Sequence, residues 1–160
     1  MGDANNDGTY INGGPIQYQL QVSRQLNPYS PEDSGYLRGL SGAEASLTAN
    51  QLWYGVFLWA KNPGSRTYTT TDNFDIVDTQ GTVFKPVKLD PAVNPYVWTA
   101  QPLAPGMVQP NPTTAAGTGG TAGNLLLFKL DNSIFENRPL TLQIRSPSNN
   151  KLWATISLDL

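Results

Sequence analysis

Short apolar runs separated by turn residues dominate the chain, and their periodicity predicts β-strands. The run 15–23, PIQYQLQVS, alternates apolar and polar residues. Four apolar side chains would share one face, those of Ile16, Tyr18, Leu20 and Val22. Period-two alternation is typical of a strand with one buried and one solvated face. We therefore expect a strand here with its polar side facing solvent.

The run 52–60, LWYGVFLWA, is apolar on both faces, which predicts a central strand covered on two sides. Leu52, Tyr54, Val56 and Leu58 would lie on one face, and Trp53, Phe57 and Trp59 on the other. A helix is the alternative. Aromatic and β-branched residues, Gly55 and the stop at Asn-Pro-Gly (62–64) argue against it.

Five further segments complete a β-rich pattern with no βαβ unit. Four of them are NFDIVD, NLLLFKL, PLTLQIRS and KLWATISLDL. The fifth, TVFKPVKL, contains Pro86, which favours an edge strand. The stretch 96–99 is one more short candidate. The pattern predicts an all-β fold, an immunoglobulin-like antiparallel β-sandwich of about seven to eight strands.

The remaining segments are read as a linker, a partly ordered connection and a mobile loop. Residues 1–13 are polar and rich in Gly and Asn, so we expect a flexible N-terminal linker before a sandwich domain at 14–160. In the long connection 24–50, Ser30 and Pro31 predict the start of a short helical turn. The tract 111–123, NPTTAAGTGGTAG, is expected to be mobile.

The composition excludes several classes of function. The chain has no Cys and no His, so it lacks thiolate metal sites and Ser-His-Asp or Cys-His catalysis. A net charge of −2 with scattered basic residues disfavours nucleic-acid binding. No apolar run reaches the ~20 residues that span a bilayer. The polar start MGDANNDG is no signal peptide, and Met1-Gly2 reads as a start left after removal of a native leader or anchor.

Two groups of acidic residues were weighed as sites. Asp3, Asn5, Asp7 and Gly8 match the opening of a calcium loop, but Gly14 stands where a bidentate Glu is needed, so a linker is preferred. The second group is Asp72, Asp75 and Asp78, whose odd spacing alternates faces on a strand. Asp75 is expected to point to solvent and Asp78 to belong to the turn before Gly81. We predict no catalytic residue, no metal and no cofactor.

Aromatic residues offer one candidate contact. Trp53 and Trp59 lie in the most apolar run and are expected in the core. Tyr96 and Trp98 stand beside prolines in a loop-rich stretch and are the better candidates for an exposed aromatic pair. Such a pair could stack on a sugar, which makes a carbohydrate-binding module the alternative function.

The chain resembles a family of bacterial immunoglobulin-like sandwich domains of unknown function, found chiefly on actinobacterial lipoproteins and membrane-anchored extracytoplasmic proteins. In architecture it is similar to the immunoprotective extracellular antigens of mycobacteria. The resemblance covers most of residues 14–146. It rests on Gly14-Pro15, LWYGVFLWAKN, DNFDIVDTQGTVFKP, LAPG (103–106) and NLLLFKLDNSIFENRPLTLQI.

This resemblance implies a place outside the cytoplasm and an N-terminal tether, and it transfers no catalytic residue. We therefore expect a non-catalytic interaction module at the cell surface. Its contacts to an unidentified protein or cell-envelope partner would come from the long loops 24–50 and 91–123. Oligomeric state and the partner's identity do not follow from the residues.

Overall fold

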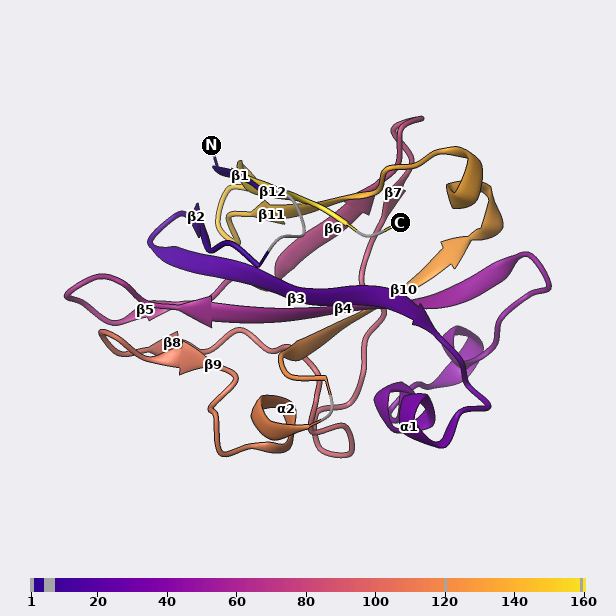
Figure 1. Cartoon of the computed structure of the whole chain (residues 1–160), viewed down its shortest axis with the longest axis horizontal. Coiled ribbons are helices and arrows are strands. Elements are labelled where there is room, and N and C mark those ends of the chain that lie inside the picture. The colour runs from indigo at the N-terminus through magenta and orange to yellow at the C-terminus, as the bar shows by residue number, and fades with distance from the viewer. Residues whose placement is uncertain (1, 5–7, 120, 159) are drawn as a thin grey trace.

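Two stacked β-sheets form the body of the protein, and a layer of loops and short helices covers the outer face of one of them (Figure 1). The computed structural model describes residues 8–119, 121–158 and 160, and the backbone of residues 2–4. Sheet A has the strand order β1 (Gly2–Ala4), β12 (Leu152–Ser157), β11 (Thr141–Arg145), β6 (Asn73–Val77) and β7 (Val83–Phe84). Sheet B has the order β10 (Asn124–Asp131), β4 (Gln51–Lys61), β3 (Ile16–Leu26) and β2 (Ile11–Gly13), with β9 (Val108–Gln109) also paired to β4.

Several short elements complete the described part of the chain. A separate pair joins β5 (Tyr68–Thr69) to β8 (Pro102–Leu103). The helices are α1 (Pro31–Ser34), α2 (Ala115–Thr118) and three 3₁₀ turns at Gly35–Leu37, Gly42–Ala45 and Asn132–Glu136. None of the helices among the described residues is long and apolar enough to cross a bilayer.

The connectivity of the long strands is that of an immunoglobulin fold. In chain order, β3 and β4 lie in sheet B, β6 and β7 in sheet A, β10 in sheet B, and β11 and β12 in sheet A. Neighbours among them pair antiparallel. Immunoglobulin domains place their strands in this way when a strand beside C joins the GFC sheet. The predicted antiparallel sandwich is confirmed.

The two faces of β4 are buried in different places, as its apolar pattern predicts. Its even-numbered residues, among them Tyr54 and Leu58, belong to the core between the sheets. Trp53 and Phe57 face the opposite side. There they form a second cluster with Leu26, Tyr36, Leu89, Leu125 and Leu127. Trp59, expected in the core, is only half-buried.

The covering layer explains why sheet B is apolar on its outer face. In Figure 1, α1 and α2 lie on the side of sheet B away from sheet A. The Asn94 side-chain amide joins two parts of this layer by donating to the carbonyls of Tyr36 and Arg38, each at 3.0 Å. Part of this cover comes from the two loops that were expected to supply partner contacts, 24–50 and 91–123. These loops therefore also bury the outer face of sheet B.

A β-bulge changes the face of the first long strand. The pairing of β3 with β4 shifts between Leu20 and Val22. Because one extra residue reverses the alternation, Val22 packs against the second cluster instead of sharing the inner face with Tyr18 and Leu20. Ser23 takes the inner position, where its hydroxyl lies 2.7 Å from that of Tyr54. The prediction that all four alternating residues share a face is wrong for Val22.

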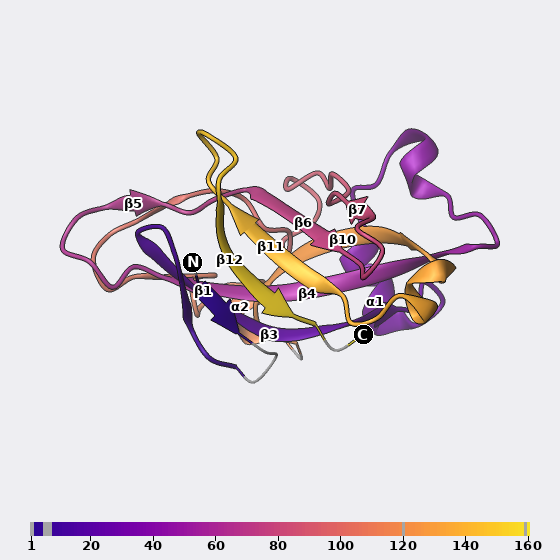
Figure 2. The ribbon, with the colours of Figure 1, turned by 90° about the horizontal axis from the view of Figure 1, so that it is seen from above.

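The N-terminal segment belongs to the sandwich, contrary to the linker expected at 1–13. Strand β1 pairs parallel with β12 in sheet A, and β2 pairs antiparallel with β3 in sheet B (Figure 2). Ile11 is buried in the core. Each of these strands is only three residues long, which is too short to show a periodic pattern. The polar composition therefore predicted a linker. Of the proposed calcium ligands, Asn5, Asp7 and the Asp3 side chain lie outside the described residues.

The structure adds detail to two loop segments. The tract 111–123 contains the one-turn helix α2, whose Ala116 is buried. The candidate strand 96–99 is reduced to one parallel bridge between Val97 and Leu125. The segment around Pro86 does lie at the edge of sheet A, although β7 itself spans only Val83–Phe84.

Helix α1 starts where the capping residues predict and is fixed to β3 by an ion pair. Ser30 caps it by accepting from the Asp33 amide at 3.5 Å. The Asp33 carboxylate accepts from Arg24 at 2.7 and 3.0 Å and from the Asn27 amide at 2.9 Å. The Arg24 guanidinium holds the pKa of Asp33 below its usual range, against the opposing effect of burial. The pair therefore makes the stability of this corner depend on pH.

An Asp33→Asn variant is expected to reduce the loss of stability on acidification. A carboxyl whose pKa is lower in the folded state stabilises the fold above its unfolded value of about 4. That contribution is lost as the pH falls through the folded value. Urea unfolding at pH 7 and at about pH 3 measures the difference for each variant. Glu32→Gln, at the exposed neighbour, is the matched control and should behave as the wild type; equal acid sensitivity of all three would contradict the assignment.

Candidate ligand-binding site

The sandwich has two lateral edges, and different segments of the chain cover them. At one edge, the N-terminal strands extend both sheets. At the other, β7 and β10 are the end strands, and the segment 85–98 bridges them. The Val87 amide donates to the Leu127 carbonyl at 2.7 Å, and the Trp98 amide donates to the Leu125 carbonyl at 2.8 Å. These two contacts leave Leu126 between them.

A pocket of about 410 Å³ opens at this edge, and we call it the edge pocket. Its lining combines both clusters of the protein, because it straddles β10. The sandwich core contributes Phe74, Trp98 and Leu126, and the second cluster and its partners contribute Val87, Leu89, Val97, Leu125 and Leu127. Asp72, Asn73, Lys85, Pro86 and Lys88 complete the lining. The lining is thus mixed, with nine apolar residues beside Asn73 and three exposed charged residues, Asp72, Lys85 and Lys88.

The expected aromatic pair is not a pair on the surface. Trp98 is only 6% exposed and packs against Phe74 and Tyr18, with ring centroids 5.5 and 6.1 Å apart. Its indole N–H donates to the Thr71 carbonyl at 2.8 Å. Tyr96 turns the other way and packs on Tyr36 in the second cluster, half-buried. Trp98 still reaches the edge pocket, as part of its wall.

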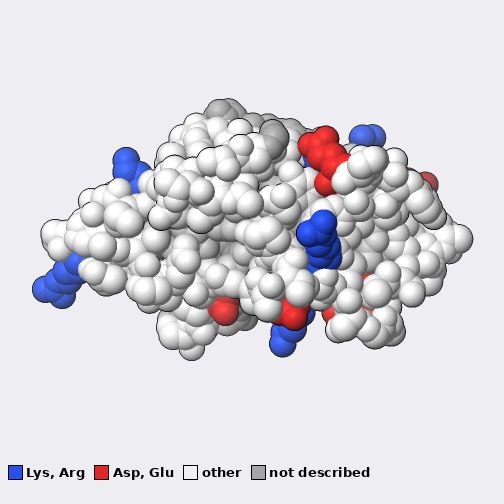
Figure 3. Space-filling model, turned by 90° about the horizontal axis from the view of Figure 1, so that it is seen from below, with Lys and Arg blue, Asp and Glu red and all other residues white. Residues whose placement is uncertain are grey.

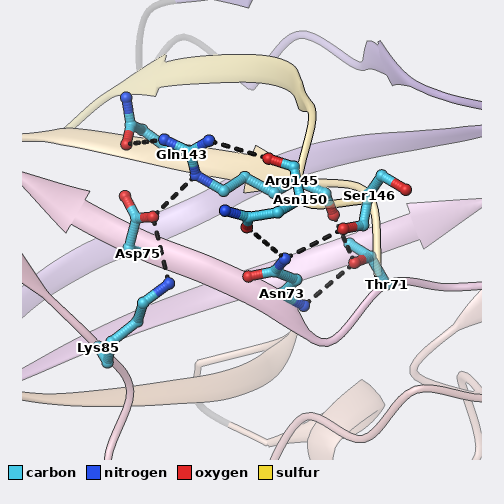
Figure 4. A network of polar contacts seen from close by, with 8 residues as sticks. All are labelled: Thr71, Asn73, Asp75, Lys85, Gln143, Arg145, Ser146 and Asn150. Atoms are coloured by element: carbon cyan, nitrogen blue, oxygen red, sulfur yellow. Dashed lines mark hydrogen bonds and ion pairs between the residues drawn. The ribbon is translucent and has the colours of Figure 1, made fainter. Parts of the chain in front are cut away.

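A buried carboxylate lies beside the pocket, on the outer face of sheet A (Figure 4). The side chain of Asp75 is 3% exposed, so the expectation that it points to solvent is wrong. Its Oδ2 atom accepts from Arg145 Nε at 3.0 Å and from Lys85 Nζ at 3.5 Å. Asp75 points away from the core, and these two long side chains, reaching from β11 and from the segment after β7, cover it. Lys85 therefore connects Asp75 to the edge pocket.

The same network fixes the hairpin between β11 and β12. Arg145 also donates to Gln143 Oε1 at 3.0 Å and to the Asn150 carbonyl at 3.1 Å. Asn73 donates to the Ser146 carbonyl at 3.0 Å and to Asn150 Oδ1 at 2.8 Å (Figure 4). The guanidinium that neutralises Asp75 is thus also held by Gln143 on β11 and by Asn150 in the hairpin turn.

The titratable groups near the pocket are held in structural contacts. Asp75 is engaged by two cations, and Asp78 accepts the Gln80 and Thr82 amides at 2.9 Å in the turn before Gly81, as predicted, although it is buried. Burial raises the pKa of Tyr18 to about 12, so this phenol is neutral at physiological pH. Within the described ranges, no three acidic side chains gather as a metal would require.

Sequence reasoning missed the edge pocket and the Asp75 network. Both depend on the meeting of segments far apart in the chain, near residues 72–75, 85–89, 97–98, 125–127 and 143–145. One local signal was present. Lys85 and Lys88 flank an apolar Pro-Val pair in the run that predicts an edge strand, but charged residues are common in such runs because they protect strand edges from pairing.

Basic side chains stand apart from one another on the face shown in Figure 3, and most of that face is uncharged. Nucleic-acid binding depends on a concentrated basic surface. The view agrees with the scattered distribution of Lys and Arg along the chain.

Comparisons with known proteins support the fold. No family model matches the sequence, and no curated protein matches it. The yjhA protein of Bacillus subtilis has a similar structure, with a TM-score of 0.61 and 12% identity over 99% of this chain and 100% of that one. So does the Bacillus subtilis protein ycdA, named "a putative lipoprotein", with a TM-score of 0.53 and 12% identity over 95% of this chain and 38% of that one.

An uncharacterised β-sandwich protein of Clostridium difficile aligns at a TM-score of 0.48 and 8% identity, over 98% of this chain and 95% of that one. Likeness at these identities concerns the fold. The strand order and connectivity make the protein an immunoglobulin-like β-sandwich. The resemblance to actinobacterial domains and mycobacterial antigens stays a prediction.

Proposed function

We propose that this chain is a non-catalytic binding module that acts outside the cytoplasm and takes its ligand in the edge pocket. The observation that carries the proposal is the pocket itself. At about 410 Å³ it falls in the range of roughly 300–1,000 Å³ typical of ligand sites. Its lining also places apolar side chains beside polar and charged ones, a combination that ligand sites use for burial and orientation.

The location outside the cytoplasm and the N-terminal tether rest on two supports. The first is the family resemblance of residues 14–146. The second is the similarity in fold to ycdA, described as "a putative lipoprotein", of which this chain spans 38%. The location is tested by treating intact cells that carry the full native gene with a protease, followed by immunoblotting. Digestion in intact cells supports display at the surface; digestion only after lysis contradicts it.

Carbohydrate binding by stacked aromatics has less support than a pocket ligand. It needs flat rings that are open to solvent. Trp98 is packed on two other aromatic rings, and Tyr96 is half-buried on Tyr36. We keep a possible contact role for Trp98 only as part of the pocket wall. Tyr96 is not among the residues that line the edge pocket.

Binding in the pocket can be tested with an apolar fluorescent probe, N-phenyl-1-naphthylamine. The wild type is expected to bind it and enhance its fluorescence, because the probe would be transferred to an apolar site. A Val97→Trp variant should weaken binding by at least about tenfold, since it fills part of the pocket with an indole ring (an effect of about 1.4 kcal/mol). Val97 is half-buried and lines the pocket.

The matched control is Val83→Trp, at an exposed position on β7 outside the lining. It adds the same ring to the surface and should leave probe affinity unchanged. Equal affinities for the wild type and both variants would show that the probe binds elsewhere and would overturn the assignment of the edge pocket. Circular dichroism of each variant establishes that it is folded.

A further inference from the structure

Two lysines on one short segment give the edge pocket an uneven charge. Lys85 and Lys88 both line it and both are exposed, and Asp72 is the one acidic residue in the lining. The chain as a whole carries a net charge of −2. The pocket lining thus has an excess of positive charge although the whole chain is negative. The overall composition does not explain this local charge.

The ion pair with Asp75 does not neutralise the charge of Lys85. Asp75 is shared by two cations, and Arg145 makes the shorter contact, at 3.0 Å against 3.5 Å for Lys85. The side chain of Arg145 is 22% exposed and that of Lys85 is 60% exposed. One carboxylate cannot neutralise both, so the group formed by Asp75, Arg145 and Lys85 keeps one positive charge. Its more exposed member is the one that lines the pocket.

Asp75 also restricts where that charge lies. Lysine has a flexible four-carbon stem, and an isolated surface lysine samples many positions. The contact with Asp75 holds the Lys85 ammonium beside the polar network (Figure 4), and the same side chain lines the edge pocket. A ligand group there would meet an ammonium on one side and the side chains of the pocket on the other.

We infer that the ligand of the edge pocket is a small amphiphilic anion, with a compact apolar body and one acidic group such as a carboxylate or sulfonate. The apolar body would contact Leu126, Val97 and the Trp98 ring, and the acidic group would pair with Lys85 and Lys88. Charge-assisted hydrogen bonds are stronger than neutral ones. Counted with Asp72, the lining and the Asp75 group retain one positive charge, which matches a monoanion. This inference rests on the proposed pocket function.

A pair of probes with one aromatic scaffold tests the charge separately from the pocket. N-phenyl-1-naphthylamine is neutral, and 8-anilinonaphthalene-1-sulfonate adds a sulfonate to the same rings. The wild type is expected to bind the sulfonate about tenfold more tightly, as two partly exposed lysines would give. In Lys85→Met/Lys88→Met the two probes should bind with similar affinity, because only the sulfonate loses its partners.

The control variant is Lys61→Met, which removes an exposed lysine at the end of β4, outside the lining. It should keep the tenfold preference. Lys88→Met alone leaves the Asp75 ion pairs intact and should lose part of the preference, which guards against an effect of altered folding in the double variant. Added salt should weaken sulfonate binding and leave the neutral probe unchanged.

The outcomes separate the two claims. Equal binding of both probes by the wild type, abolished by Val97→Trp, overturns the anion inference and leaves the pocket function standing. A sulfonate preference that survives the double lysine variant also overturns the inference. Failure of the wild type to bind either probe counts against the pocket function itself and, with it, the inference.

Discussion

Replacing Trp98 with alanine is expected to lower the free energy of unfolding by about 4 kcal/mol. Removing a large aromatic side chain from a core costs roughly 3–5 kcal/mol through lost contacts and the cavity left behind. Trp98 contacts both Phe74 and Tyr18, and its loss leaves the Thr71 carbonyl without the indole donor. For a chain of this size, the melting temperature should fall by roughly 10 °C.

A Trp98→Phe variant separates packing from the hydrogen bond. It keeps a ring in the core and loses the indole N–H, so the expected cost is about 1–2 kcal/mol. Urea unfolding of both variants measures the difference. A Trp98→Ala variant within about 1 kcal/mol of the wild type would mean that the indole is on the surface, and the carbohydrate reading would regain its basis.

The second large effect is expected from Arg145. An Arg145→Met variant should lose about 3 kcal/mol of stability, because the buried Asp75 carboxylate would keep only the exposed Lys85 as a partner. Breaking a buried ion pair by removing one member costs roughly 3–5 kcal/mol, and the partial exposure of Arg145 places the effect at the lower end. Chemical denaturation at neutral pH measures it.

Two variants make this prediction specific to the uncompensated charge. Asp75→Asn combined with Arg145→Met should recover part of the loss, since no unpaired carboxylate remains. Lys85→Met alone should cost at most about 1 kcal/mol, as is usual for exposed partners. A double variant no more stable than Arg145→Met would show that the loss comes from the other contacts of Arg145, those to Gln143 and Asn150.

Much of the fold could be predicted because its longest strands carry strong local patterns. The doubly apolar run 52–60 can be satisfied only by cover on two sides, and the structure supplies the core on one and the second cluster on the other. Ser30 and Pro31 likewise act through their nearest neighbours. These features depend on contacts or geometry that the local residues largely determine.

The errors arose where distant segments decide the environment. Asp75 reads as a solvated strand residue, and it is buried only because Arg145 and Lys85 reach over it from other segments. Trp98 reads as a loop residue beside prolines, and its segment is held on the edge of β10 by backbone hydrogen bonds. The edge pocket was missed for the same reason.

Very short strands and single-residue β-bulges also cannot be predicted from the apolar pattern. Strands β1 and β2 have three residues each, too few to show a period. The bulge after Leu20 leaves no mark in the sequence, yet it moves Val22 to the other face. In both cases the partner strand, and not the segment itself, sets the outcome.

The edge that holds the edge pocket should open more readily than the centre of sheet B. Where β10 meets the segment 85–98, a few backbone contacts, including the Val87 and Trp98 amides, close the edge. The amides of β3 and β4 are held in eleven-residue strands at the centre of sheet B. Local fluctuations release weakly held amides to solvent exchange long before global unfolding does. The ligand site thus lies at an edge that should open more readily than the centre of sheet B, and a bound ligand would slow amide exchange there.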